Sequence, residues 1–507
     1  MEARSCMDII HFPDSLGDLA VQALAKYISG LLINLVKLLK CRTPQVSNKN
    51  HIQETCSYLE NLISNTVPPS LADDVTARLL AFLNVTFKQM MRSDHSECIR
   101  AVTSSLVSAI IHPLITKLEY TDCKKHPTLA DFYYNTHQFD IIFLASPKMK
   151  NLKVLRIGVT SRMRLMYEKF ISENLEEVSI HSCHDEDVSV LSNICKGLKS
   201  LDISRSWQLT DSCVASILKF RYLEELIMED VSMSAEGLRK ILEGIADSTE
   251  TSRAMNLRSL SCDRLTNSDI TLISEKFKNL TSFSLSRIVN NNLTPLKELK
   301  NLTKLVLKNG PFHLMIDLLQ VIGKQLRCLQ LERISEVNIR FVVEKCPLVH
   351  CLDLDVDLGL SVNSSVAEYS ISNPFPNYLS VQCLHLSTPN LKESDVLEYI
   401  VSRCNRVKNL LLSCFISLSL FQKILMRKEL EHLEEFLWRI PFRYRDIIVH
   451  FSEGYMTLQL FDCRSDRIPM RKYVITNEEF NKDPEFYFRQ CLRHQLSDIC
   501  TTSLPFY

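Results

Sequence analysis

A short hydrophobic pattern recurs along most of the chain after about residue 150. Two leucines stand three residues apart and a third apolar residue follows one polar position later, as in LKSLDI from Leu198 and LTKLVL from Leu302. The matching segments begin at Leu152, Leu175, Leu198, Leu223, Leu257, Leu280, Leu302, Leu326, Val349, Val381, Val407 and Leu433. Most intervals between them are 22 to 26 residues, and two exceed 30 because they carry insertions. A fixed period of this length predicts a repeat architecture.

Within each segment the apolar and polar positions alternate, as they do in a half-buried strand. In the segment LDIS, Leu201 and Ile203 are expected to face the core, and Asp202 and Ser204 to face solvent. Stretches with helix-start signals follow the strands, such as LTDSCVASILKF at 209–220 and LTNSDITLISEKF at 265–277. Since no unit can bury its own apolar face, the units are expected to stack into a curved solenoid with parallel strands on the concave side.

The template L-x-x-L-x-L, at a period of about 20 to 29 residues, resembles the leucine-rich repeat. The segment CKGLKSLDISRSWQLTDSCV from Cys195 resembles the cysteine-containing subclass of that family, and Cys346 and Cys404 stand at the equivalent place in later units. This resemblance implies an α/β leucine-rich-repeat solenoid that binds other proteins.

Both ends of the chain depart from the repeat. Residues 1 to about 112 have helical spacing, with helices expected over 15–39, 50–64, 70–91 and 95–112. Near the other end, 446–463 predicts a hairpin with Glu453–Gly454 at its turn, and a Phe/Tyr-rich tail, 483–494, is expected to pack on the last unit. We therefore expect an all-α region over 1–112, a solenoid over 113–440 and a C-terminal cap over 441–507.

Composition narrows the function classes. Lys plus Arg and Asp plus Glu number 59 each, so no basic excess points to nucleic acid, and the 10 glycines form no phosphate-binding motif. The first residues lack a secretory pattern, and Gln22, Lys26, Asn34 and Lys37 interrupt the apolar stretch 19–39, so no signal peptide or membrane span is expected. The 18 cysteines form no CxxC pair, which is typical of reduced thiols in a cytoplasmic or nuclear protein.

One loop is a candidate metal site, because HSCHDED brings together His181, Cys183, His184, Asp185 and Asp187. No second ligand cluster at a suitable spacing accompanies it, and it falls where a repeat turns from strand to helix. We therefore interpret it as a solvated polar turn and expect no metal and no other cofactor. Because catalytic motifs are also absent, the sequence favours a protein that is not an enzyme.

Acidic side chains predominate at the outward positions of the predicted strands. They are Glu177, Asp202, Glu225, Glu229, Asp263, Glu332, Asp353, Asp355 and Glu435, set against Arg156, Lys304, Lys308 and Arg439. One hypothesis is a mildly acidic groove that binds a basic segment of a protein partner, since complementary charge orients partners. The alternative is an ordinary charged and solvated face.

The first predicted helix contains a short motif of its own. SLGDLAVQAL resembles the elongin-binding box of the von Hippel–Lindau type, S/T-L-x-x-x-C-x-x-x-aliphatic, with Ser15, Leu16 and Leu24 in place and Ala20 where that family usually has Cys. The same stretch also resembles an F-box of the aromatic-Pro-x-x-Leu kind, which implies a Skp-type adaptor instead. A third interpretation is a helix that only caps the solenoid.

A second motif follows some forty residues later. VPPSLADDV resembles the companion cullin-selecting box, through Val67, Pro68, Leu71 and Val75. In this order ahead of leucine-rich repeats, the two motifs resemble the Zyg/Zer group of ubiquitin-ligase substrate receptors, although the armadillo-like C-terminal half of that group is missing. The resemblance implies that Leu16 enters an adaptor pocket of elongin B/C bound to a cullin, and that the solenoid holds the substrate. The competing class is a leucine-rich-repeat scaffold without a ligase.

Overall fold

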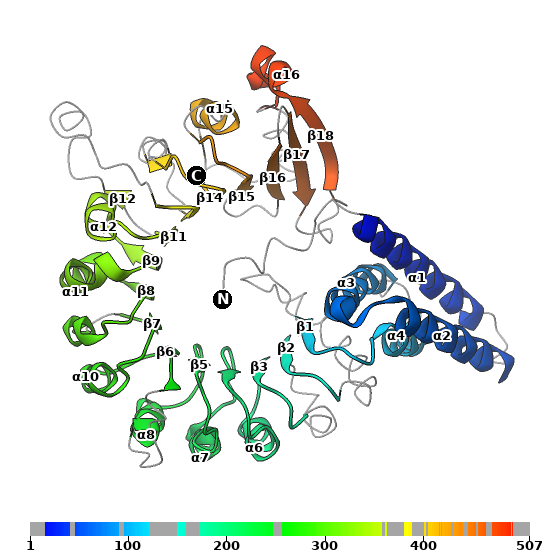
Figure 1. Ribbon diagram of the computed structural model, residues 1–507, viewed down its shortest axis with the longest axis horizontal. Coiled ribbons are helices and arrows are strands. Elements are labelled where there is room, and N and C mark those ends of the chain that lie inside the picture. The colour runs from blue at the N-terminus through cyan, green and yellow to red at the C-terminus, as the bar shows by residue number, and fades with distance from the viewer. Residues whose placement is uncertain are drawn as a thin grey trace, which may run out of the picture. The chain divides into compact units, whose positions relative to one another are not determined.

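The computed structural model describes residues 16–40, 46–90, 96–120, 150–158, 172–246, 256–288, 291–356, 360–361, 380–387, 400–401, 404–414, 416, 418–426, 430–439, 445–452, 455–462, 469–487 and 489. The chain divides into two compact units, Met1–Leu257 and Arg258–Tyr507. Within each unit, the repeats place their strands along one side and their helices along the other (Figure 1).

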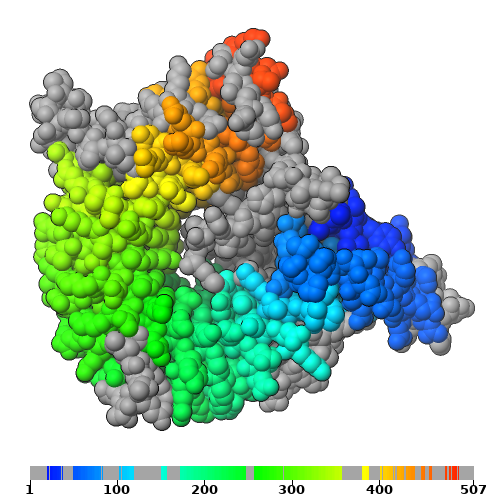
Figure 2. All heavy atoms as spheres, viewed as in Figure 1, coloured from blue at the N-terminus to red at the C-terminus, as the bar shows by residue number. Residues whose placement is uncertain are grey.

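The first unit begins with a helical region. Its elements are α1 (Leu16–Lys40), α2 (Val46–Thr66), the 3-10 turn η3 (Pro69–Leu71), α3 (Ala72–Met90) and α4 (Ser96–Ile110). Helix α1 packs against α3 and α4, and α2 packs against α4, so that their side chains form a continuous blue surface (Figure 2). The four predicted helices are confirmed, with α2 beginning at Val46 rather than at 50. Among the described residues, no helix has both the length and the apolar character needed to cross a bilayer.

The repeats of the first unit contribute neighbouring parallel strands. The strands are β1 (Lys117–Tyr120), β2 (Val154–Gly158), β3 (Glu177–His181), β4 (Ser200–Asp202) and β5 (Glu225–Met228). The helical elements are α6 (Asp185–Ile194), η6 (Asp211–Cys213), α7 (Val214–Ile217) and α8 (Ala235–Ala246). Strand β1 comes before the first repeat that the pattern identified, and Ile115 and Leu118 are buried at its start.

The second unit continues the same plan. Its parallel strands are β6 (Ser259–Asp263), β7 (Ser282–Ser286), β8 (Lys304–Pro311), β9 (Cys328–Ser335), β11 (Cys351–Asp355), β13 (Cys383–Ser387), β14 (Asn409–Ser413) and β15 (Glu435–Arg439). The helical elements are α10 (Asn267–Lys276), η7 (Thr294–Glu298), η8 (Phe312–Met315), α11 (Ile316–Ile322), η9 (Gly323–Gln325), α12 (Ile339–Lys345) and α15 (Leu418–Met426). Strands β10 (Val337–Asn338) and β12 (Leu360–Ser361) form a separate parallel pair.

The sheet register explains why the leucine pattern is so regular. Every matching segment places its strand two residues after its first apolar residue, and Phe283, Leu305 and Leu329 lie directly opposite one another on β7, β8 and β9. All three are fully buried. The core positions predicted from alternation are likewise at most 2% exposed: Leu201, Ile203, Leu226, Leu305, Leu307, Leu329, Leu331, Leu352 and Leu354. The expected parallel-stranded α/β repeat fold is thereby confirmed.

The C-terminal segment changes direction. Strands β16 (Arg445–Ser452), β17 (Tyr455–Asp462) and β18 (Pro469–Thr476) pair antiparallel after β15, and α16 (Asn477–Lys482) follows. The predicted hairpin is confirmed by the pairing of β16 with β17, although Glu453–Gly454 lies outside the described residues. From α16, the Phe480 ring lies between Phe421 of α15, at 6.4 Å, and Tyr487 of the tail, at 5.8 Å between centroids. The tail after 489 also lies outside the described residues.

Candidate partner-binding surfaces

The polar side of the strands is the first candidate surface. We call it the strand face: the outward positions of the strands, on the side away from the repeat helices. The nine predicted acidic residues lie on these strands or directly after one: Glu177 on β3, Asp202 on β4, Glu225 on β5, Glu229 after β5, Asp263 on β6, Glu332 on β9, Asp353 and Asp355 on β11, and Glu435 on β15. Within each unit, the parallel strands therefore place these acidic residues on the same side of the sheet.

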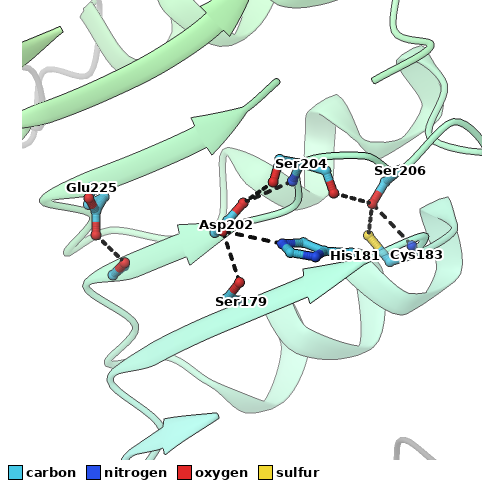
Figure 3. A network of polar contacts seen from close by, with 8 residues as sticks. Ser179, His181, Cys183, Asp202, Ser204, Ser206 and Glu225 are labelled. Carbon is cyan, nitrogen blue, oxygen red and sulfur yellow. Dashed lines mark hydrogen bonds and ion pairs between the residues drawn. The ribbon is translucent and has the colours of Figure 1, made fainter. Parts of the chain in front are cut away.

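Asp202 is the centre of a polar network in the first unit (Figure 3). Its Oδ2 accepts a hydrogen bond from Ser179 Oγ at 2.9 Å and lies 3.6 Å from His181 Nε2. Its Oδ1 accepts from the Ser204 amide at 3.0 Å and from Ser204 Oγ at 2.7 Å. The network joins β3 to β4 and to the turn that follows β4.

The surroundings of Asp202 act on its pKa in opposite directions. Burial by itself raises the pKa of the carboxyl, because removal from water disfavours the charged form. The hydrogen bond and charge of His181, together with the hydrogen bonds from Ser204, outweigh burial and hold the pKa below its ordinary value. The charged carboxylate of Asp202 therefore stabilises the contact between β3, β4 and the following turn, in addition to lying on the strand face.

Two other acids of the first unit are also paired across strands. Arg156 Nη2 on β2 lies 2.9 Å from Glu177 Oε2 on β3. Ser200 Oγ on β4 donates to Glu225 Oε2 on β5 at 2.7 Å. Each contact joins side chains on neighbouring parallel strands, which is where such pairs support a sheet.

The second unit repeats this arrangement. His385 Nδ1 on β13 lies 2.7 Å from Asp353 Oδ1, and Gln330 Nε2 on β9 donates to Asp353 Oδ2 at 3.2 Å. Lys308 Nζ lies 3.4 Å from Glu332 Oε2. Because these carboxylates already have partners within the chain, the strand face offers a basic segment less free charge than the acidic residues alone indicate.

Sequence reasoning missed a set of cations at the edge where the strands end. Arg264 and Arg287 follow β6 and β7, and Arg333 holds the same place within β9, with φ values of 55°, 61° and 53°. This left-handed conformation costs an L-residue free energy, and all three side chains are exposed. The repeat pattern does contain the signal, since each Arg lies two residues after the third apolar position of its segment.

The HSCHDED loop is not arranged around a common centre. His181 faces Asp202, whereas the amide of the buried Cys183 donates to Ser206 Oγ at 3.1 Å, and the Cys183 Sγ lies 3.1 Å from the same oxygen (Figure 3). Asp187 caps α6 by accepting from the His184 amide at 2.7 Å. Among the described residues, no group of three or more metal-ligating side chains is placed to hold an ion.

Helix α1 is the second candidate surface, and it has two apolar sides. Ile28, Leu32 and Leu35 are buried within the helical region. On the other side Ala20, Ala23 and Tyr27 are exposed, Tyr27 to 51%, and Leu24 is half-buried. The side chain of Leu16 lies outside the described residues, as does Ser15. We call Ala20, Ala23, Leu24 and Tyr27 the outer stripe of α1.

The VPPSLADDV motif lies where the helical region meets the first strand. Val67 is half-buried, Pro68 is exposed, and Leu71 is 49% exposed in η3, whereas Val75 is buried on α3. Asp73 in the same motif is bonded to Thr116 and Lys117 at the start of β1. The motif therefore combines exposed apolar residues with a contact that holds the fold together.

Comparison with known proteins found no matching family model and no matching curated protein. Solved structures with a similar fold include the complex of Rad7 and Elc1 from yeast, at 13% identity and a TM-score of 0.30 over 78% of this chain and 73% of that one. They also include an internalin, InlF, from Listeria monocytogenes, at 15% identity and a TM-score of 0.27 over 76% and 97%. A third is a leucine-rich-repeat protein of Leptospira interrogans, at 15% identity and a TM-score of 0.24 over 66% and 92%.

The chain's own architecture defines its class. Each repeat contributes one parallel strand, followed in most repeats by a helix or 3-10 turn, and leucines fill the same register positions on successive strands. This is the leucine-rich-repeat fold, whose stacked strands present an extended surface for binding proteins.

Proposed function

We propose that this protein is the substrate-recognition subunit of a cullin-RING ubiquitin ligase. In this proposal the strand face holds a protein substrate, and the outer stripe of α1 binds an adaptor of the elongin C type. The observation that supports it most is the outer stripe, of which Ala20, Ala23 and Leu24 belong to the segment that resembles the elongin-binding box and Tyr27 follows three residues later. An amphipathic helix with a free apolar side is a common way of docking into a partner's groove.

The residues near the second motif support the same proposal. Leu71 and Pro68 expose apolar surface one turn before α3, in the segment that resembles the cullin-selecting box. No catalytic role is proposed for any residue. The ligase's transfer chemistry would lie in other subunits, and this chain would contribute binding alone.

The adaptor part is tested by substitution on the two sides of α1. Tyr27→Glu and Ala20→Glu should abolish co-purification of elongin C while leaving the melting temperature nearly unchanged, because both side chains are exposed. The matched control is Lys26→Glu, an exposed neighbour that is not part of the outer stripe and should keep the adaptor. Folded Tyr27→Glu protein that still recovers elongin C would overturn the assignment.

The second candidate function is a scaffold in which the helical region only caps the repeats. It is favoured by Asp73, whose bonds to Thr116 tie α3 to β1. Affinity purification followed by mass spectrometry separates the two candidates. Recovery of elongin C supports the ligase receptor. Recovery of a Skp-type adaptor supports a ligase receptor with that adaptor instead of elongin C, and recovery of neither adaptor supports the scaffold.

The charge of the substrate is a finer part of the proposal. Glu332 and Asp355 are partly exposed in register on β9 and β11 of the second unit, whereas Asp353 is buried in its network, so a basic segment would contact Glu332 and Asp355. Glu332→Gln combined with Asp355→Asn should weaken substrate capture and reduce its salt dependence without unfolding the protein. Unchanged capture by the folded double variant would count against a basic partner.

A further inference from the structure

Three cysteines form a row on the strand face of the second unit. Cys351 on β11 lies in register with Cys328 on β9 and, on its other side, with Cys383 on β13. Neighbouring strands lie about 4.8 Å apart, so each pair of α-carbons falls within the range that a disulfide can bridge. All three cysteines are free and partly exposed, unlike Cys346 and Cys404, which are buried.

The contacts along this row distinguish the three thiols. On the neighbouring strands, Cys351 of β11 and Lys304 of β8 both lie in register with Cys328. At the other end, Asn409 Nδ2 donates to Cys383 Sγ at 3.7 Å. Cys328 therefore has a second thiol on one side and a cation on the other, and a nearby cation stabilises a thiolate.

The acidities follow from this geometry. The hydrogen bond from Cys351 lowers the pKa of Cys328 despite its burial, and Lys304 acts in the same direction. The pKa of Cys351 is raised, because losing its proton would break that hydrogen bond. Burial raises the pKa of Cys346 to about 12, so that this thiol serves as an unreactive reference.

We propose that Cys328 and Cys351 form an oxidisable dithiol that hydrogen peroxide converts into a disulfide between β9 and β11. The Cys328 thiolate attacks one peroxide oxygen, so that an S–O bond forms, the O–O bond breaks, and hydroxide leaves and becomes water with the proton that Cys328 released. The Cys351 sulfur then attacks the Cys328 sulfenic acid; the S–S bond forms, the S–O bond breaks, and the hydroxyl group leaves with the Cys351 proton as water. Two thiols are oxidised by two electrons and one peroxide is reduced to two waters.

The bond would alter the surface that the fold presents to partners. It joins two strands at the first outward position of each, next to Leu329 and Leu352 in the core. Two hydrogen-bonding thiols would be removed from the strand face, and the two repeats would be cross-linked. This inference is independent of the ligase proposal, because the oxidation requires neither an adaptor nor a substrate.

The test uses the full chain, reduced and then treated with a small excess of hydrogen peroxide near pH 7. After free thiols are blocked with N-ethylmaleimide, peptide mass spectrometry should find a Cys328–Cys351 cross-link that dithiothreitol reverses. Oxidation at Cys328 should be at least about tenfold faster than at Cys346. Equal rates at the two sites, or a first-formed Cys351–Cys383 bond, would overturn the proposal.

Single substitutions separate the roles of the two sulfurs. Cys351→Ser should leave a sulfenic acid on Cys328 that dimedone traps, whereas Cys328→Ser should leave Cys351 unoxidised under the same conditions. Cys383→Ser is the matched control on the next strand and should form the disulfide normally. Circular dichroism establishes that each variant is folded.

Discussion

The carboxylate of Asp73 on α3 holds Thr116 at the entrance to the first strand. Asp73 Oδ1 accepts from the Thr116 amide at 2.7 Å, and Oδ2 accepts from its hydroxyl at 2.6 Å. The same contact recurs between repeats, where Asp185 accepts from the amide and hydroxyl of Thr210 at 2.8 and 2.7 Å. The pair of bonds is the same, but Asp185 joins α6 to the start of η6 in the next repeat, whereas Asp73 joins α3 to the start of β1.

Asp73→Ala is therefore expected to loosen the helical region from β1. Hydrogen bonds to a charged group contribute more than neutral ones, so the loss should be about 1–2 kcal/mol of unfolding free energy for this partly exposed site. Denaturant unfolding measures it, and amide exchange at Thr116 and Lys117 should accelerate. The matched control is Asp74→Ala, which removes only an exposed pair with Arg78 and should cost under about 0.5 kcal/mol. Equal losses for the two variants would contradict a joining role for Asp73.

Leu305→Asp should unfold the repeats around β8. Leu305 is fully buried in register with Phe283 and Leu329, and a charge placed there has no partner, so we expect a loss of at least about 3 kcal/mol. Unfolding in urea measures this effect. Gln382→Asp puts the same charge at an exposed strand entrance and should change stability little. A stable Leu305→Asp protein would be inconsistent with a core position.

The Asp202 network should make stability depend on acidity. The folded-state pKa of Asp202 lies below its ordinary value of about 3.9, so the stabilisation is fully present above that value and is lost as the pH falls through the lowered one. Wild-type protein should therefore be more stable than Asp202→Asn at about pH 5, and the difference should shrink towards about pH 2. Urea midpoints at several pH values measure it. Glu173→Gln, at an exposed carboxyl before β3, serves as the control. A pH-independent difference between wild type and Asp202→Asn would contradict this role.

Two glycines should respond oppositely to alanine. At Gly310 on β8 a Cβ would overlap the carbonyl oxygen of Ile288, a backbone atom that cannot simply move aside, so Gly310→Ala should destabilise the protein. At Gly30 on α1 a Cβ would meet nothing within 4 Å, so Gly30→Ala should stabilise it by up to about 1 kcal/mol through helix propensity. Melting temperatures of the two variants compare them directly. A shift of the same sign in both would disagree with this local packing.

The sequence alone determined the repeat fold, because the buried positions recur as apolar residues at a regular spacing. Leu305 and Leu329 occupy the same position of their segments, and the alternation of side chains along a strand directs that position to the core in every repeat. The four N-terminal helices followed from the 3.6-residue spacing of apolar residues in the same way. The acidic residues of the strand face could also be named, since outward positions follow from inward ones.

Only the tertiary structure decided what those outward residues contact. Arg156 and Glu177 are 21 residues apart, and Asp353 and His385 are 32 apart, so their pairing depends on the register between strands and not on any local pattern. For the same reason, the three segments RCL, HCL and QCL each looked like an ordinary strand entrance until the sheet aligned Cys328, Cys351 and Cys383 in one row. Hydrophobic burial is a property of one residue and can be predicted from periodicity. A hydrogen bond or a dithiol requires two residues, and the distance between them is fixed only when the chain has folded.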